Sequence, residues 1–272
     1  MNKYFKANKK IWNAWTAINS SSELYDVDGF KQGKCSLLGI ELEEVGDVQD
    51  KKLLHLQCHF GMDTLSWARR GADVTGVDFS TDAIELACSL AAELDIPAKF
   101  IQCNIYDLPV HLSEKFDIVF TSAGVLCWLP DLKRWAEIIA HFLKPGGLFY
   151  IREFHPIEFM FDDAKEKLTP TIRYPYFHCD EPIYCEEEGN YADPNSNIKC
   201  VNYEWSHHLG EIITSLTGAG LRIEFLHEFP FITYKSRPFL VEGEDGFWRY
   251  PDLEGGLPLM FSIRAVKDKK QR

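Results

Sequence analysis

Several features that mark other classes of protein are missing from this sequence of 272 residues. Its eight cysteines form no Cys-x-x-Cys pair, and several lie in apolar patterns, which favours reduced, buried thiols over a disulfide framework. No run of 18 apolar residues occurs, and the lysine-rich start is not followed by an apolar core of signal-peptide length. We therefore expect a cytoplasmic protein that does not enter a membrane.

The charge balance also excludes a class of partner. The formal net charge is −12, so the average surface repels a phosphate backbone, and we expect no nucleic-acid partner. The sequence contains no internal repeat and no low-complexity tract. With 46% hydrophobic residues, its length suits one large α/β domain with an elaboration better than two independent domains.

The most informative stretch covers residues 53–156. An apolar run at 53–56 is followed by a turn-like loop at 57–62, a helical segment at 63–70 and a second apolar run at 73–78 that ends in an acid. A strand, a tight loop, a helix and a strand ending in a carboxylate form the arrangement that binds a nucleoside across a sheet edge. The spacing therefore predicts a ligand that contains a nucleoside.

The same alternation continues along the chain. Ser80 or Thr81 can cap a helix that ends before Pro97, and Pro130-Asp131 opens another. Further strands are expected at 99–103, 116–120 and 148–151, the last one after a turn at 144–147. Strands and helices that alternate at this length imply parallel strands joined by right-handed crossovers.

The flanking segments are less regular. We expect an amphipathic helix at 4–18, an irregular or small β insertion at 157–205, a helix at 206–217 and strands at 221–226 and 258–266 that form an antiparallel hairpin at the sheet edge. The expected division of the chain is a cap at 1–50, a ligand-binding core at 51–156, an aromatic-rich insertion at 157–205 and the rest of the core sheet at 206–272.

Four features in order resemble the class I S-adenosylmethionine-dependent methyltransferases. They are the first strand and loop at 54–61, the acid Asp78, the pair Asn104-Ile105 after the third strand, and residues 143–147 before the fifth. The resemblance implies an α/β fold, a Rossmann-like doubly wound sheet of seven mostly parallel strands with an antiparallel last strand. It also implies S-adenosylmethionine as cofactor and methyl transfer to a small-molecule acceptor.

The first loop departs from the family pattern D-x-G-x-G-x-G. The corresponding positions hold His55, Gln57, His59 and Gly61, so only the last glycine is kept. Glycine is favoured there because the backbone approaches the ligand and can need positive φ. The larger side chains either point away from the ligand or replace backbone contacts with their own, and a decayed loop that binds no cofactor is the alternative.

The resemblance assigns a set of residues to the cofactor. Asp78 would accept the ribose hydroxyls from a loop outside the core, although capping the next helix is its alternative role. Asn104 would bind the adenine amino group through its side-chain carbonyl. The full set is Gln57, His59, Gly61, Asp63, Thr64, Asp78, Phe79, Asn104, Ile105, Thr121 and Ser122.

Catalytic residues are harder to assign, because methyl transfer needs alignment of the acceptor, exclusion of water and at most removal of a proton. His155 is the predicted general base, with Glu153 beside it, and a histidine that is only packed before Pro156 is the alternative. Trp12 and Trp15, together with the aromatic insertion, are expected to form a lid over the acceptor, or else a satellite core.

Other functions remain open on the sequence alone. A nicotinamide-dependent oxidoreductase shares the strand-loop-helix-strand-acid order, but the G-x-G-x-x-G spacing is missing. A non-catalytic ligand-binding protein could use the same fold. We expect no metal site, because no pair among His178, Cys179, Cys185, His207 and His208 has standard zinc-ligand spacing.

Overall fold

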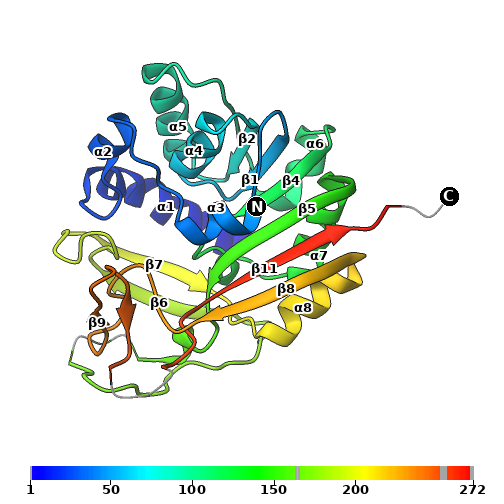
Figure 1. Ribbon diagram of the computed structural model, residues 1–272. Coiled ribbons are helices and arrows are strands. Elements are labelled where there is room, and N and C mark those ends of the chain that lie inside the picture. The colour runs from blue at the N-terminus through cyan, green and yellow to red at the C-terminus, as the bar shows by residue number, and fades with distance from the viewer. Residues whose placement is uncertain (1, 163, 165, 252–255, 270–272) are drawn as a thin grey trace.

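The computed structural model describes residues 2–162, 164, 166–251 and 256–269. Its centre is a seven-stranded sheet of order β3-β2-β1-β4-β5-β11-β8 (Figure 1). The strands are β1 Lys52–Leu56, β2 Asp73–Asp78, β3 Lys99–Gln102, β4 Phe116–Thr121, β5 Leu143–Phe154, β8 Leu221–Phe229 and β11 Met260–Lys267. The first five are parallel, and β11 is antiparallel to both of its neighbours. This confirms the predicted fold class and the late hairpin.

Both faces of the sheet are covered, as parallel strands require. On one face Leu54 and Leu56 of β1 pack in a core with α7 and α8, and on the other Leu53 packs with Trp67 of α4. The covering helices are α4 Met62–Arg69, α5 Thr81–Glu93, α6 Leu108–His111, α7 Leu132–Phe142 and α8 Leu209–Gly218. Ser80 caps α5 and Asp131 caps α7 through their side chains, as predicted.

The expected turn at 144–147 is part of a strand. Helix α7 ends at Phe142 and β5 begins at Leu143, with a shift of register against β4 between Phe116 and Ile118. A side chain at Gly147 would meet the carbonyl oxygens of Lys144 at 2.9 Å and Asp117 at 3.1 Å. The two strands therefore approach so closely here that only glycine fits.

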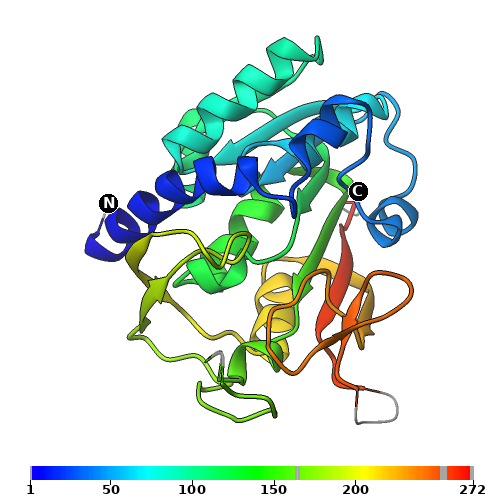
Figure 2. The same cartoon turned by 90° about the vertical axis from the view of Figure 1, so that its left-hand side faces the viewer.

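The segments outside the sheet gather beyond the carboxyl ends of its strands (Figures 1 and 2). The N-terminal part holds α1 Lys3–Ser21, α2 Val27–Lys31 and α3 Gly39–Val45. The insertion contains an antiparallel hairpin of β6 Ile183–Glu188 and β7 Lys199–Glu204, against which α1 packs. A second small hairpin, β9 Val241–Glu242 and β10 Trp248–Arg249, follows β8.

Short 3-10 turns connect several of these elements: η1 Ile105–Asp107, η2 Leu126–Trp128 and η3 Glu158–Met160. Over the described ranges of the chain, no helix is both long and apolar enough to cross a membrane.

Candidate functional site

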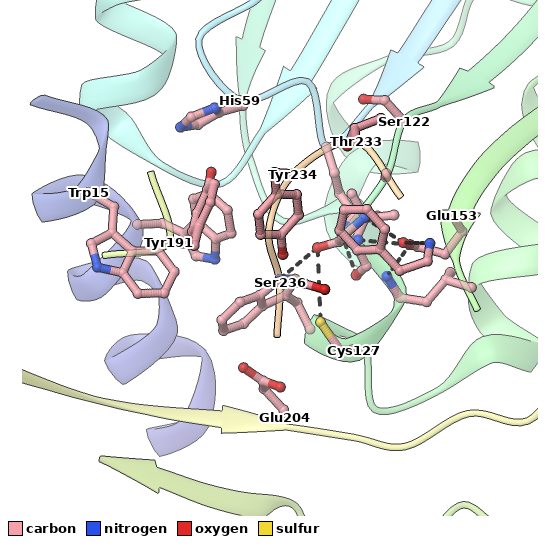
Figure 3. A pocket seen from close by; sticks show the side chains of 18 of the residues that line it. Trp15, His59, Ser122, Cys127, Glu153, Tyr191, Glu204, Thr233, Tyr234 and Ser236 are labelled. Atoms are coloured by element: carbon pink, nitrogen blue, oxygen red, sulfur yellow. Dashed lines mark hydrogen bonds between the residues drawn. The ribbon is translucent and has the colours of Figure 1, made fainter. Parts of the chain in front are cut away.

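A cavity of about 1210 Å³ lies at the carboxyl ends of β1, β2, β4 and β5. Its other walls come from α1, the β6–β7 hairpin and the segment 233–238 after β8. Figure 3 shows His59 and Ser122 on the sheet side and Glu204 on the hairpin side, with Tyr234 and Ser236 between them. This is the edge where α/β sheets bind ligands.

Most residues predicted to bind the cofactor line this cavity: Gln57, His59, Gly61, Asp63, Asp78, Phe79, Asn104, Ile105 and Ser122. Trp12 and Trp15 of α1 line it too. These residues lie together because each follows a parallel strand or lies on a helix above that edge, and their roles as cofactor ligands stay predictions.

Thr64 and Thr121 do not line the cavity, which corrects their predicted role as cofactor ligands. Both are fully buried. The Thr64 hydroxyl is 2.8 Å from His55 Nδ1 beneath the loop. The neighbouring positions, Asp63 and Ser122, face the cavity instead, because successive residues of a strand or helix turn point in different directions.

His55 stands where the family pattern has an acid, and its two ring nitrogens contact the hydroxyls of Thr64 and Ser122. Its ring is 1% exposed, and its Nε2 is 3.2 Å from the Ser122 hydroxyl. Burial lowers the pKa of His55 to about 3, so the ring is neutral at pH 7. His55 thus connects β1, α4 and the end of β4 without adding a charge to the site.

The loop keeps a glycine-like backbone although two of the glycines are missing. Gln57 has φ 56° and His59 has φ 52°, both left-handed, as is Gly61 at φ 81°. A side chain at Gly61 would lie 2.8 Å from the ring of Phe100. Left-handed backbone costs an ordinary residue about 1–2 kcal/mol, and strain of this kind persists where function requires the conformation. The loop has therefore kept its shape.

The two unusual side chains meet the walls of the cavity. Gln57 Nε2 donates to the Val125 carbonyl at 3.1 Å, while its Oε1 has no partner among the described residues. The His59 ring packs at 5.2 Å from Trp12 and 5.4 Å from Tyr25. Burial lowers the pKa of His59 to about 3, so this ring is also neutral at pH 7.

His59→Gly is expected to weaken the binding of S-adenosylhomocysteine about tenfold, or about 1.4 kcal/mol, because the cavity loses an imidazole that can contact the ligand. The matched control is Asp95→Gly, at an exposed residue that has the same φ of 52°. The Asp95→Gly protein should be about 1 kcal/mol more stable to unfolding, because glycine adopts this backbone conformation without strain, and its affinity should be unchanged. Urea unfolding and calorimetric titration measure both effects. A His59→Gly protein that binds as well as the parent contradicts direct contact.

Asp78 is more deeply built into the fold than predicted. It is 7% exposed, its Oδ2 accepts from the His59 backbone N–H at 2.9 Å, and its Oδ1 accepts from that of Ser80 at 2.8 Å. Burial raises the pKa of Asp78 to about 6. The expectation of a loop acid outside the core is therefore wrong. Each carboxylate oxygen keeps further acceptor capacity toward the cavity.

Asn104 is already engaged at the atom assigned to adenine. Its Oδ1 accepts from the Tyr106 backbone N–H at 3.0 Å and so caps η1. That oxygen keeps a second lone pair and the residue lines the cavity, so its role toward adenine stays a prediction. Phe79 and Ile105 supply apolar wall at the same end.

A buried cluster of charges that sequence reasoning missed lies beside Asp63. Arg152 Nε donates to Glu41 Oε1 at 2.9 Å, and both side chains are buried. Burial, followed by the charge of Glu41, raises the pKa of Asp63 to about 6. Arg152 and Asp63 both line the cavity. The local sequence explains only one contact of Glu41, whose Oε2 accepts from the Leu38 N–H at the start of α3. Its ion pair with Arg152 of β5 joins distant parts of the chain.

The structure does not bring His155 into the cavity. Its side chain is 2% exposed, its Nε2 lies 2.9 Å from Glu228 Oε1 on β8, and its Nδ1 accepts from the Ile157 N–H at 3.2 Å. The chain leaves β5 at Phe154, and the ring turns toward the neighbouring strands. This placement contradicts the predicted general-base role.

Glu153 does line the cavity, but its carboxylate is occupied by backbone. It accepts from the N–H groups of Gly124 at 2.5 Å, Val125 at 2.8 Å, Leu126 at 3.1 Å and Phe154 at 2.7 Å. Four backbone donors around one buried carboxylate fix the shape of the loop after β4. The geometry assigns Glu153 to positioning that loop rather than to proton transfer.

Comparison with known proteins agrees with this geometry. A family model described as "Methyltransferase domain" matches residues 54–151, from β1 into β5. Residues 54–151 are therefore similar to a methyltransferase domain.

Two curated relatives to which the chain is similar are named ubiquinone biosynthesis O-methyltransferase. The protein from Photorhabdus laumondii is 34% identical over 106 residues, which cover 39% of this chain and 44% of the relative. That from Alkalilimnicola ehrlichii is 27% identical over 143 residues, covering 53% and 54%. The chain thus spans about half the length of the curated relatives it matches.

Solved structures extend the likeness of fold beyond residues 54–151. An S-adenosylmethionine-dependent methyltransferase from Mesorhizobium loti superposes with a TM-score of 0.58 at 19% identity, covering 87% of this chain and 99% of that one. One from Clostridium acetobutylicum gives 0.55 at 15% identity, covering 98% and 100%. At these identities the likeness shows the fold.

The walls of the cavity also carry buried polar atoms that have no protein partner among the described residues. Within the described ranges these are Trp15 Nε1, Trp205 Nε1, Ser236 Oγ, Asn190 Nδ2 and Glu158 Oε1, all on cavity-lining residues. Buried polar atoms in native proteins are nearly always satisfied. These atoms are free to bond to water or to a polar ligand in the cavity. Sequence reasoning missed the segment 233–238, which has no periodic pattern.

Proposed function

We propose that the chain is an S-adenosylmethionine-dependent methyltransferase that acts on a small-molecule acceptor. The observation that carries this proposal is the loop in which Gln57 and His59 keep the left-handed backbone of missing glycines. The same loop is held by Asp78, whose carboxylate reaches the cavity. A loop that had lost its ligand would have no reason to retain this strain.

The residues around the loop fit the cofactor from end to end. Asp78 offers carboxylate oxygens to ribose hydroxyls, and Phe79 and Ile105 offer an apolar wall to a base. Arg152 and Asp63 lie at the opposite end, where one can pair with a carboxylate and the other with an ammonium group. The cavity exceeds the range of about 300–1,000 Å³ typical of single-ligand sites, which supports a second molecule beside the cofactor.

When bound, S-adenosylmethionine supplies an electrophilic methyl group on a sulfonium centre. The protein needs to align the acceptor and exclude water, and no residue has to form a covalent intermediate. Trp12 and Trp15 pack edge to face with centroids 5.3 Å apart on the cavity wall. We assign α1 and the insertion to closing the cavity, where their rings also favour a neighbouring cation.

The chemistry of the acceptor follows from the far wall. Aromatic rings at Trp15, Trp205, Tyr191 and Tyr234 favour a planar molecule. Unpartnered N–H, hydroxyl and carboxylate atoms beside them favour one that carries both donors and acceptors. We therefore propose a small planar acceptor with hydroxyl or amine groups, which agrees with the O-methyltransferase names of the relatives.

A screen of metabolite fractions for release of S-adenosylhomocysteine tests the activity. We expect turnover with fractions that contain small aromatic hydroxyl or amine compounds, and none with fractions of proteins or nucleic acids. Exposed Glu137 of α7, changed to Gln, provides a control that should keep the parent rate. Tight cofactor binding without turnover in any fraction would contradict the catalytic proposal and favour a ligand-binding role.

A further inference from the structure

Three potential metal ligands meet where the insertion reaches the start of α8. His178 comes from the insertion, His207 lies two residues before α8, and Glu211 lies in the first turn of that helix. One atom from each side chain lies within 4.8 Å of the other two. His207 is buried, and the other two are partly buried.

The hydrogen bonds of His207 leave a lone pair facing a carboxylate. Its Nε2 is 2.7 Å from the Leu129 carbonyl oxygen, which can only accept, so Nε2 carries a proton. Its Nδ1 is 3.1 Å from Glu211 Oε2. In a neutral ring that nitrogen is an acceptor, so two acceptors face each other inside the protein. A cation between them, or a second proton on the ring, removes this conflict.

His178 has the same arrangement on a neighbouring ring. Its Nδ1 is 3.1 Å from the Ser206 carbonyl oxygen and so carries the proton, which leaves the Nε2 lone pair available. The two imidazoles are stacked, with centroids 4.9 Å apart and planes at 11°. Metal-binding histidines commonly donate their other N–H to a backbone carbonyl, which fixes the tautomer and the ring orientation.

We propose that His178, His207 and Glu211 bind a divalent transition-metal ion of the zinc type. Two imidazoles and one carboxylate are a common ligand set for zinc, with a fourth position left for water. Bonds of about 2.0–2.1 Å to a tetrahedral ion place ligand atoms about 3.4 Å apart, close to the 3.1 Å observed for His207 and Glu211. The expectation of no metal site considered only cysteine and histidine spacings and overlooked this i,i+4 pair.

The position of the site indicates what the ion does. His207 lines the cavity and is anchored to Leu129 after β4, whereas His178 belongs to the insertion. An ion bound by all three ligands ties the insertion to the core beside the cavity. It therefore holds the wall opposite the cofactor loop in place.

Zinc titration of the full chain, purified without a histidine tag and stripped with chelator, tests the site in competition with a chromophoric chelator. We expect one zinc per chain with submicromolar affinity, and a zinc-dependent rise in melting temperature. Cobalt in place of zinc should give visible absorption bands of a low-coordinate nitrogen and oxygen site. These readouts do not depend on enzyme activity.

Substitutions connect the binding to the three residues. His178→Ala and Glu211→Gln should each lower zinc affinity on the order of 100-fold, since each removes one of three protein ligands. His111→Ala removes an exposed histidine of α6 and should change nothing. A folded parent chain that binds less than a tenth of an equivalent, or variants that bind zinc like the parent, would overturn the proposal. The contact is then an imidazolium–carboxylate pair.

Discussion

Asp78→Ala is expected to weaken the binding of S-adenosylhomocysteine by about 1.5–3 kcal/mol, or roughly 10- to 150-fold. The substitution removes an ionised acceptor from the ribose end of the cavity. It also leaves the N–H groups of His59 and Ser80 without their acceptor, so the free energy of unfolding should fall by about 1–3 kcal/mol. Both losses have one cause, because the carboxylate that meets the ligand also holds the loop.

Calorimetry and urea unfolding separate the two effects. Asp82→Ala, an exposed acid in the first turn of α5, is the matched control and should alter neither. Protonation of Asp78, whose pKa is about 6, should also lower affinity about tenfold between pH 7 and pH 5, because only its ionised form accepts two hydroxyls, and protonation of Asp63, with a similar pKa, adds to this fall. If stability falls while affinity is unchanged, Asp78 only caps the loop.

Glu153→Gln is expected to lower the free energy of unfolding by about 2–3 kcal/mol, and Glu153→Ala by about 3–5 kcal/mol. The four backbone donors around Glu153 need a carboxylate, and an amide offers one oxygen and presents its own donors to the rest. Burial raises the pKa of Glu153, but the four N–H groups act in the opposite direction and stabilise the charge.

Chemical denaturation of both variants beside Glu137→Gln measures this effect. The control residue is an exposed glutamate on α7 and should be neutral. A Glu153→Gln protein of unchanged stability that has lost all turnover would give Glu153 a direct chemical role and refute the positioning role.

The order of strands and the residues at their ends could be predicted because both follow from local patterns. Asp78 ends an apolar strand, and parallel strands bring their carboxyl ends to one edge. The directions in which individual side chains point could not be predicted from these patterns. His155 directly follows β5 in the sequence, which is where a general base is expected. Its ring instead bonds to Glu228, seventy-three positions later, and points away from the cavity.

Long-range pairs and irregular segments account for what the sequence did not reveal. Glu41 and Arg152 are 111 positions apart, and no pattern in either segment indicates that they form a buried ion pair. The left-handed backbone of Gln57 and His59 could be inferred only from the glycines that the family has at these positions, because residues other than glycine rarely adopt it. Each of these features depends on packing around the cavity rather than on the neighbouring sequence.

The most direct test of the account is calorimetric titration of the full chain with S-adenosylmethionine, S-adenosylhomocysteine and NADH. We predict that one molecule of either adenosyl ligand binds per chain with micromolar affinity and that NADH does not bind. A well-folded protein that binds neither adenosyl ligand would contradict the account, and binding of NADH alone would favour an oxidoreductase.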